Sequence, residues 1–199
     1  MTTRQGLMLA DWSFTAIVTG TFGIFARGIS TTTTNSYTYS GGAIAAGTAL
    51  GGNVSSGTAV GNATLGIFAL AGGAATTKSY TYSGGTVANG TSLVSGMNNG
   101  AAVGNATLGI FALGGGTTTT KRYTYSGSSV AAGTALASGL NTSGAAVGNA
   151  TLGIFALAGG TTGTNSYTYS GGTVAAGTAF SAYTNNGCAA GNGTTGVNM

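Results

Sequence analysis

Short apolar segments separated by glycine-containing turns recur along the chain, and residues 101–140 show the pattern in a single copy. The apolar and alternating segments of this copy predict four strands, at residues 101–103, 106–113, 121–126 and 130–136. Gly104-Asn105 joins the first two strands, with glycine first, as a type II′ hairpin turn prefers. Gly127-Ser128 joins the last two, so each copy is expected to form an up-and-down antiparallel sheet.

The same pattern recurs four times at a spacing of 43 or 44 residues. A Tyr-Thr-Tyr motif and a Gly-Ile-Phe-Ala motif mark each copy, with first residues at Tyr37, Tyr80, Tyr123 and Tyr167 and at Gly23, Gly66, Gly109 and Gly153. A fixed period of this length is typical of one supersecondary unit copied along the chain, each copy burying its apolar face on its neighbours. We therefore interpret residues 1–199 as a single repeat domain.

The markers divide this domain into four copies and a partial fifth, at about residues 12–55, 56–98, 99–142, 143–186 and 187–199. Residues 4–10 resemble the end of a fourth strand and are a candidate closing strand. The predicted fold is all-β, a β-propeller-like ring of four four-stranded antiparallel blades with a partial fifth. A β-solenoid is the alternative, although it does not need the paired two-residue turns.

Three segments of each copy carry a family resemblance. An apolar strand ending in glycines, a tyrosine segment and a Gly-Thr segment occupy residues 68–73, 82–87 and 90–93, and again residues 155–160, 169–174 and 177–180. Their order resembles the kelch repeat, and most closely the glycine- and threonine-rich kelch-like arrays of tailed-bacteriophage virion proteins. The resemblance covers roughly residues 12–186 and implies a ring closed by strands from opposite ends of the chain. Two features depart from the family pattern: Ile44, Val87, Val130 and Val174 replace the kelch tryptophan, and the first copy keeps only Gly28 of the glycine pair.

Titratable side chains are scarce in this chain. Five residues are Lys or Arg, one is Asp or Glu, and none is His. General acid–base catalysis and metal binding need such groups in clusters, so we expect no enzyme activity, no metal site and no cofactor. Cys188, the single cysteine, has no histidine to activate it and is interpreted as a small apolar residue.

The same composition argues against two kinds of partner. Five cations, two of them adjacent, make no stripe that follows a phosphate backbone, so we expect no nucleic acid. Strands of about five to eight residues fall short of the roughly 9–11 that span a bilayer, so no membrane insertion is expected. A protein with so little charge to keep its copies apart suits a fixed place in an assembly.

Paired tyrosines are the best candidates for contact chemistry. The pairs are Tyr37 and Tyr39, Tyr80 and Tyr82, Tyr123 and Tyr125, and Tyr167 and Tyr169. Residues two apart in a strand share a face, so the two rings of each pair lie on one side of the sheet. One interpretation has the rings packed between blades, and the other has a ring of tyrosines stacking on sugar faces.

The position two residues before each first tyrosine is a candidate binding rim. It holds Asn35, Lys78, Lys121 and Asn165, with Arg122 beside Lys121. Repeat symmetry places these residues on one rim, where exposed cations are also ordinary for a solvated surface.

Two functional classes compete. The resemblance, the low charge and the missing catalytic residues favour a structural or adhesion protein of a virus particle, such as a phage decoration, fibre or tail-associated module, which binds other virion subunits or itself. The alternative is a lectin-like carbohydrate-binding propeller, located outside the cell or at its surface, with a host-surface glycan as partner. A lectin is expected to repeat its polar rim faithfully, so the alternation of Asn and Lys favours the first class.

We also expect the isolated monomer to be incomplete. The partial fifth copy breaks off inside its second strand, and an unfinished blade leaves an open row of backbone donors and acceptors. Neither terminal segment carries the Pro or Lys that usually protects such an edge. A neighbouring subunit is therefore expected to cover it.

Overall fold

The computed structural model describes residues 14–16, 22–26, 31–70, 72–141, 144–182, 187, 189–191 and 196–198. Within these ranges every regular element is a β-strand, so the all-β class is confirmed. No helix in the described part is long and apolar enough to cross a membrane. The candidate closing strand at residues 4–10, Gly28 and Cys188 lie outside the described residues.

The second, third and fourth copies each fold into a four-stranded antiparallel sheet, as the apolar segments and glycine turns predict. The second copy contains β5 (Thr58–Gly61), β6 (Leu65–Ala69), β7 (Thr77–Thr81) and β8 (Thr86–Asn89). The third contains β9 (Ala101–Gly104), β10 (Leu108–Ala112), β11 (Thr120–Thr124) and β12 (Ser129–Ala132). The fourth contains β13 (Ala145–Gly148), β14 (Leu152–Ala156), β15 (Thr164–Thr168) and β16 (Thr173–Ala176). In each sheet, strands adjacent in the chain are adjacent in space.

The first copy departs from this pattern. Its strands are β1 (Phe14–Ala16), β2 (Phe22–Ala26), β3 (Thr34–Thr38) and β4 (Ile44–Gly47). Only β2, β3 and β4 form its sheet, while β1 pairs in parallel with β5, so the expectation of four antiparallel strands is wrong here. The first hairpin of the later copies also differs from the expected type II′ turn at Gly-Asn. Gly61, Gly104 and Gly148 are the last residues of β5, β9 and β13 and have no positive φ. The Asn62 N–H donates to the Leu65 carbonyl over 2.9 Å, so the chain turns at the two residues after the asparagine, and the predicted turn position is wrong.

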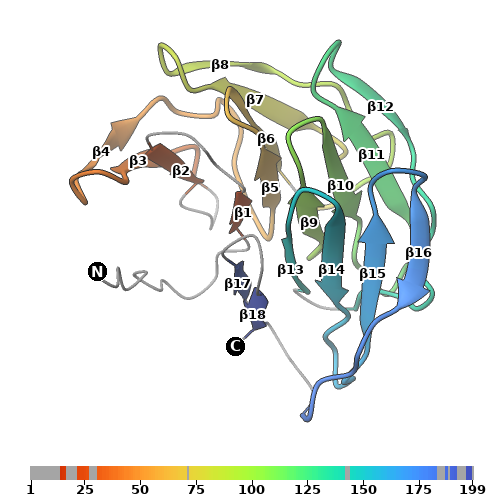
Figure 1. Ribbon diagram of the computed structural model, residues 1–199. Coiled ribbons are helices and arrows are strands. Elements are labelled where there is room, and N and C mark those ends of the chain that lie inside the picture. The colour runs from red at the N-terminus through yellow and green to blue at the C-terminus, as the bar shows by residue number, and fades with distance from the viewer. Residues whose placement is uncertain are drawn as a thin grey trace.

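The sheets stand side by side in a fan. Figure 1 shows β1, β5, β9, β13 and β17 (Ala189–Gly191) on the inside and β8, β12 and β16 on the outside. β17 pairs with β18 (Gly196–Asn198) as the first hairpin of the partial fifth copy. Parallel pairing between successive copies, which a β-solenoid requires, joins only β1 to β5 among the described strands. The other ladders between named strands are antiparallel and lie within one copy, so the solenoid alternative is wrong.

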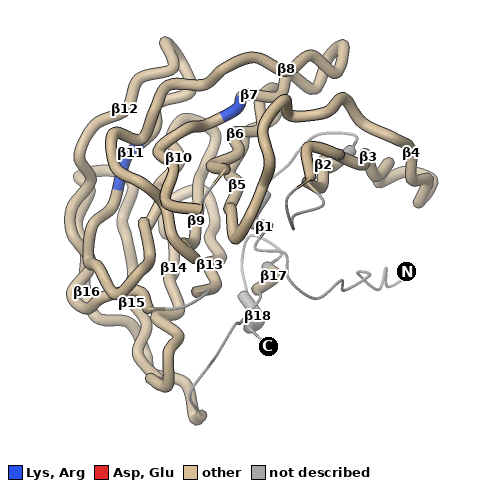
Figure 2. The backbone as a smooth tube through the Cα atoms, turned by 180° about the vertical axis from the view of Figure 1, so that it is seen from behind, with Lys and Arg blue, Asp and Glu red and all other residues tan. Residues whose placement is uncertain are grey.

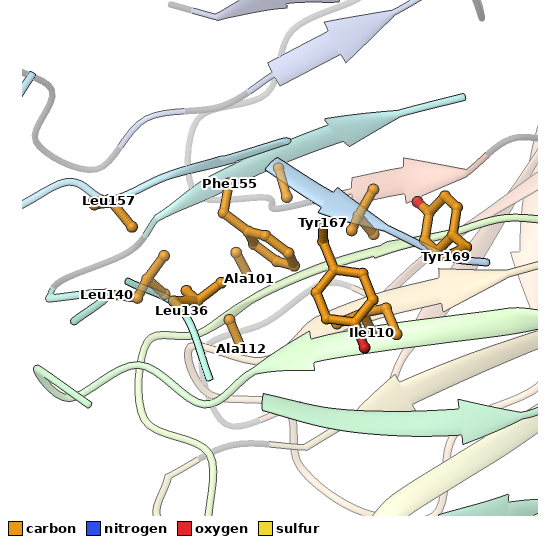
Figure 3. Packing of buried hydrophobic residues seen from close by; sticks show 11 residues of the cluster. Ala101, Ile110, Ala112, Leu136, Leu140, Phe155, Leu157, Tyr167 and Tyr169 are labelled. Carbon is orange, nitrogen blue, oxygen red and sulfur yellow. The ribbon is translucent and has the colours of Figure 1, made fainter. Parts of the chain in front are cut away.

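The hydrophobic core lies between neighbouring sheets. Ile67 and Leu93 of the second copy pack in one cluster with Phe111 and Tyr123 of the third. The next interface repeats this packing (Figure 3), with Ile110, Leu136 and Leu140 on one side and Phe155 and Tyr167 on the other. Adjacent residues in a strand lie on opposite faces, so each sheet has an isoleucine face toward the next copy and a tyrosine face toward the preceding one. Both faces of β10 are covered, as the alternation of Ile and Phe predicts, since Ile110 and Phe111 are fully buried.

A pair of glycines allows successive sheets to approach closely at the first hairpin. Gly104 in β9 lies opposite Gly109 in β10. Val60 of the preceding sheet and Tyr125 converge on this pair, and a Cβ on Gly109 would lie 2.5 Å from Val60 Cγ1 and 3.2 Å from Tyr125 Oη. We call such a pair a glycine notch. The arrangement recurs one copy later, with Gly148, Gly153, Val103 and Tyr169.

Hydrogen bonds from the asparagines of these hairpins join the sheets at the same place. Asn62 Nδ2 donates to the carbonyl of Ala106 over 3.1 Å, and Asn105 Nδ2 donates to the carbonyl of Ala150 over 3.0 Å. The Oδ1 atom of each asparagine accepts the backbone N–H groups two and three residues on. Each asparagine side chain therefore stabilises its own hairpin and also bonds to the next sheet.

Replacing Gly109 by alanine is expected to destabilise the protein by about 1–3 kcal/mol, the usual cost of overpacking a close-packed site. The added methyl group would overlap Val60, so adding Val60→Ala should reduce this penalty and give a coupling free energy of at least about 0.5 kcal/mol. Urea unfolding of the two single variants and the double variant measures the coupling. Gly41→Ala is the matched control, because nothing lies within 4 Å of its added Cβ. Strictly additive effects would contradict the contact between Val60 and the glycine notch.

Candidate functional site

The paired tyrosines lie on the tyrosine faces of their sheets, mostly between neighbouring copies. The buried ones are Tyr80, Tyr123, Tyr125, Tyr167 and Tyr169. A buried ring has no face left for a sugar, so the packing interpretation describes these five residues. Tyr37 and Tyr39 of the first copy are the only described pair in which both rings are partly open to solvent.

The two rings of each pair contact one another. Their centroids lie 6.0 to 6.3 Å apart in the four pairs, a spacing at which aromatic rings attract. The rings of Tyr37 and Tyr39 meet edge to face, with an interplanar angle of 67°. The other pairs are tilted by 44° to 48°. Each pair is thus a preformed aromatic unit, which in the later copies fills the space between two sheets.

Burial leaves several tyrosine hydroxyls without the polar partner that a buried phenol usually has. The Oη atoms of Tyr123, Tyr125 and Tyr169 have no hydrogen-bond partner among the described residues. Burial raises the pKa of Tyr82 to about 12 and also holds the pKa of Tyr125 and Tyr169 well above the ordinary value of a phenol. Near neutral pH these side chains are therefore uncharged, and they contribute apolar and aromatic surface rather than acid–base chemistry.

The predicted rim residues do not gather into one accessible patch. Asn35, Lys78 and Lys121 are half-buried at equivalent positions of β3, β7 and β11. Lys78 Nζ donates to Asn89 Oδ1 over 2.6 Å. Arg122 is exposed and lies on the face of β11 opposite Lys121. Figure 2 shows the described cations on β7 and β11, two separate sheets of the fan.

Asn165 is a clear correction to the predicted rim. It is only 2% exposed, because the loop after β12 covers it. The Ala137 N–H donates to Asn165 Oδ1 over 2.7 Å, and Asn165 Nδ2 donates to the carbonyl of Thr164 over 2.8 Å. Its amide group therefore links the third and fourth copies, and the expectation of an accessible rim is wrong at this position.

Two shallow clefts lie between neighbouring copies. The larger, of about 310 Å³, lies between the first and second copies, and its polar side chains are Ser36, Thr38, Thr48, Tyr80 and Tyr82. The smaller, of about 260 Å³, lies between the first hairpins of the second and third copies, and it is lined by Asn62, Thr64, Leu65, Ala106, Thr107, Tyr125 and Ser126. Both clefts present hydroxyl, amide and apolar groups without a charged side chain.

Sequence reasoning did not find the hydroxyl side of the larger cleft. Ser36 and Thr38 alternate with Tyr37 and Tyr39 along β3, so they lie on the isoleucine face and meet the tyrosine face of the second copy. The signal was present in the Ser-Tyr-Thr-Tyr motif, whose alternate residues carry hydroxyl groups.

The described surface carries little charge. Lys78, Lys121 and Arg122 are its only charged side chains, and no three His, Cys, Asp or Glu residues within the described ranges lie together as a metal site would need. No protein-family model matches the chain, and no curated protein matches it. The described surface can bind through shape, hydrogen bonds and aromatic contact.

Raising the pH through tyrosine ionisation is expected to destabilise the fold. The pKa of Tyr82 is about 12 in the folded protein, against a reference value of 10.0. Its contribution to stability is therefore complete below pH 10 and is lost as the pH rises from about 10 through 12, by up to about 1.4 kcal/mol per pH unit. Urea unfolding at a series of alkaline pH values measures this slope, and tyrosinate absorbance at each pH reports the ionisation. Tyr82→Phe should make the slope shallower in this interval, and an unchanged slope would mean that the hydroxyl is solvated.

Proposed function

We propose that this chain is a non-catalytic structural and adhesion module of a virus particle, a decoration, fibre or tail-associated protein that acts through surface binding and assembly. The chemistry of the outer strands is the observation that carries the proposal. The side chains of β4, β8, β12 and β16 are largely exposed, and not one of them is charged. Exposed edge strands normally carry Lys, Pro or a bulge that keeps other chains away. Edges without these features suit a protein whose neighbours cover them.

The proposed architecture is kelch-like and β-propeller-like, with the sheets of one chain arranged as part of a ring. The four-stranded sheets run from an inner to an outer strand, as propeller blades do, and their first strands gather on the inside of the fan (Figure 1). The same interface recurs between the second and third copies and between the third and fourth. A repeated interface gives a repeated rotation between sheets, which favours a ring. The partial fifth copy contributes β17 and β18 to a further blade.

Mass spectrometry of purified virus particles tests the proposed location. The chain is expected at a fixed ratio to the major coat protein in every preparation, and it should remain after nuclease treatment and washing in high salt. Salt resistance is expected because a contact made by uncharged strands is not weakened by ionic screening. A chain found only in the soluble fraction of infected cells, or at a ratio that varies between preparations, would contradict a structural role.

A second candidate function is that of a carbohydrate-binding propeller, with a host-surface glycan as its partner and a location outside the cell or at its surface. The larger cleft favours it, because the hydroxyl side chains of Ser36, Thr38 and Thr48 and the half-buried ring of Tyr82 line a space between the first and second copies. Binding pockets of small molecules combine aromatic walls with a few polar groups that fix orientation. Neutral hydroxyl groups suit an uncharged sugar better than an ionic ligand.

Removing a single hydroxyl group from the larger cleft tests glycan binding. Thr38→Val removes a cleft hydroxyl while keeping the shape of the side chain, and it should weaken binding of a neutral glycan about tenfold, the effect of one lost hydrogen bond. Thr81→Val, at the equivalent position of the second copy, is the matched control and should leave binding unchanged. A glycan array identifies the ligand, and calorimetry measures the affinity of each variant. Equal effects of the two substitutions, or no bound glycan, would count against this second function.

A further inference from the structure

The tyrosine face of the first copy is partly uncovered, although its counterparts are among the best-buried surfaces of the molecule. Tyr123 in the third copy is 0% exposed, whereas Tyr37 is half-buried and Tyr39 is 37% exposed. Ile44 is 60% exposed, while the equivalent Val130 packs against the core. This face combines two tyrosines and an isoleucine, and no neighbouring sheet covers it within the described part of the chain.

At the other end of the fan, the isoleucine face of the fourth copy is less buried than the isoleucine face of the third copy. Ile154 and Phe180 are half-buried, whereas the equivalent Ile110 and Leu136 of the third copy are buried. Val147, which corresponds to the valines that enter the glycine notches, is also half-buried. β17 and β18 lie against β13 and still leave this surface partly open.

These two surfaces match each other in the same way as the faces that already meet within the chain. At each internal interface, Ile and Leu side chains of one copy cover Phe and Tyr side chains of the next. The tyrosine face of the first copy is arranged like those of the later copies, since a Cβ on Gly23 would lie 2.8 Å from Tyr39 Oη, and one on Gly109 would lie 3.2 Å from Tyr125 Oη. Neither surface holds a charged side chain among the described residues.

We propose that the tyrosine face of the first copy binds the isoleucine face of the fourth copy in a second molecule of this chain, head to tail. Figure 1 shows β3 and β4 at one end of the fan and β15 and β16 at the other, so a single molecule in this arrangement does not bring the two faces together. The contact continues the interface that already repeats along the chain. Because it joins two different surfaces, each pair of molecules keeps one open face of each kind, and further molecules can add until a ring closes or a filament forms.

This inference rests on the proposed assembly role and deepens it by naming the surface and the partner. Sedimentation velocity of the full chain at rising concentration tests it, and the wild-type protein should associate. Ile44→Asp places a carboxylate in the contact and should raise the dissociation constant by about tenfold or more, because burying an unpaired charge is costly. Val94→Asp is the matched control, since Val94 is an equally apolar side chain that is 77% exposed on a loop outside both faces.

A mixing experiment tests the head-to-tail geometry itself. Ile44→Asp blocks the tyrosine face and keeps the isoleucine face, whereas Phe180→Asp does the reverse. At a concentration at which the wild-type protein has just associated, each variant alone should stay largely monomeric. An equimolar mixture should form dimers and nothing larger, because only one productive pair of faces remains. Circular dichroism confirms that both variants are folded, and if Phe180→Asp is not, the comparison of Ile44→Asp with Val94→Asp decides alone.

Three results would overturn the contact: a wild-type monomer at every concentration, association of Ile44→Asp equal to that of the wild type, or an equal loss in Val94→Asp. Each of these results is separable from the proposed location in a virus particle. A chain that is a stoichiometric component of particles but does not associate with itself refutes the head-to-tail contact alone. A chain that associates as described but is missing from particles refutes the proposed location alone.

Discussion

Val60 and Val103 each project onto a pair of glycines in the next sheet, and this contact sets how closely the sheets approach. Because these glycines have no Cβ, the valine of one copy and the second tyrosine of the next copy can both pack directly against the glycine backbone. The asparagine of the adjacent turn can then reach the neighbouring sheet, because a side-chain amide spans only a short gap. The closely spaced sheets in turn bury Ile110 and Phe111 on opposite sides of a single strand. Close packing of this kind makes interiors sensitive to one added methyl group.

The same closeness explains why the tyrosines are structural in most copies. A ring held between two sheets contributes a large apolar surface, and that gain outweighs hydroxyls such as those of Tyr123 and Tyr125 that have no partner among the described residues. An unpartnered hydroxyl is less costly than an unpartnered charge, so an interface of this type tolerates phenols but not carboxylates. The scarcity of charge in the chain follows from this packing as well as from any role in assembly. The surface that remains for recognition carries little charge and is largely made of strands.

Much of the fold could be predicted from the sequence, because the period, the glycine-containing turns and the alternation of Ile and Phe are local signals that agree with one another. The four-stranded sheets of the later copies follow directly from them. The position of the first turn was predicted wrongly, since Gly61, Gly104 and Gly148 lie at the ends of strands. The first copy could not be predicted in the same way, since the pairing of β1 with β5 depends on a contact distant in sequence. The candidate site was harder to predict, because the burial of each side chain decides whether it is available to a ligand. Asn165 and Lys78 occupy equivalent positions, and only the fold of the preceding loop shows that the former is buried.

That equivalent position also shows where the copies are free to diverge. It lies on the tyrosine face beneath the loop of the preceding copy, so a short amide can be enclosed by that loop, as at Asn165. A long lysine instead places its ammonium group at the edge of the contact, where Lys78 bonds to Asn89 of the neighbouring strand. Variation between Asn and Lys therefore reflects two ways of satisfying one structural position. Differences between copies at this position are no sign of distinct binding sites, and recognition is better sought at the outer strands and at the two partly open faces.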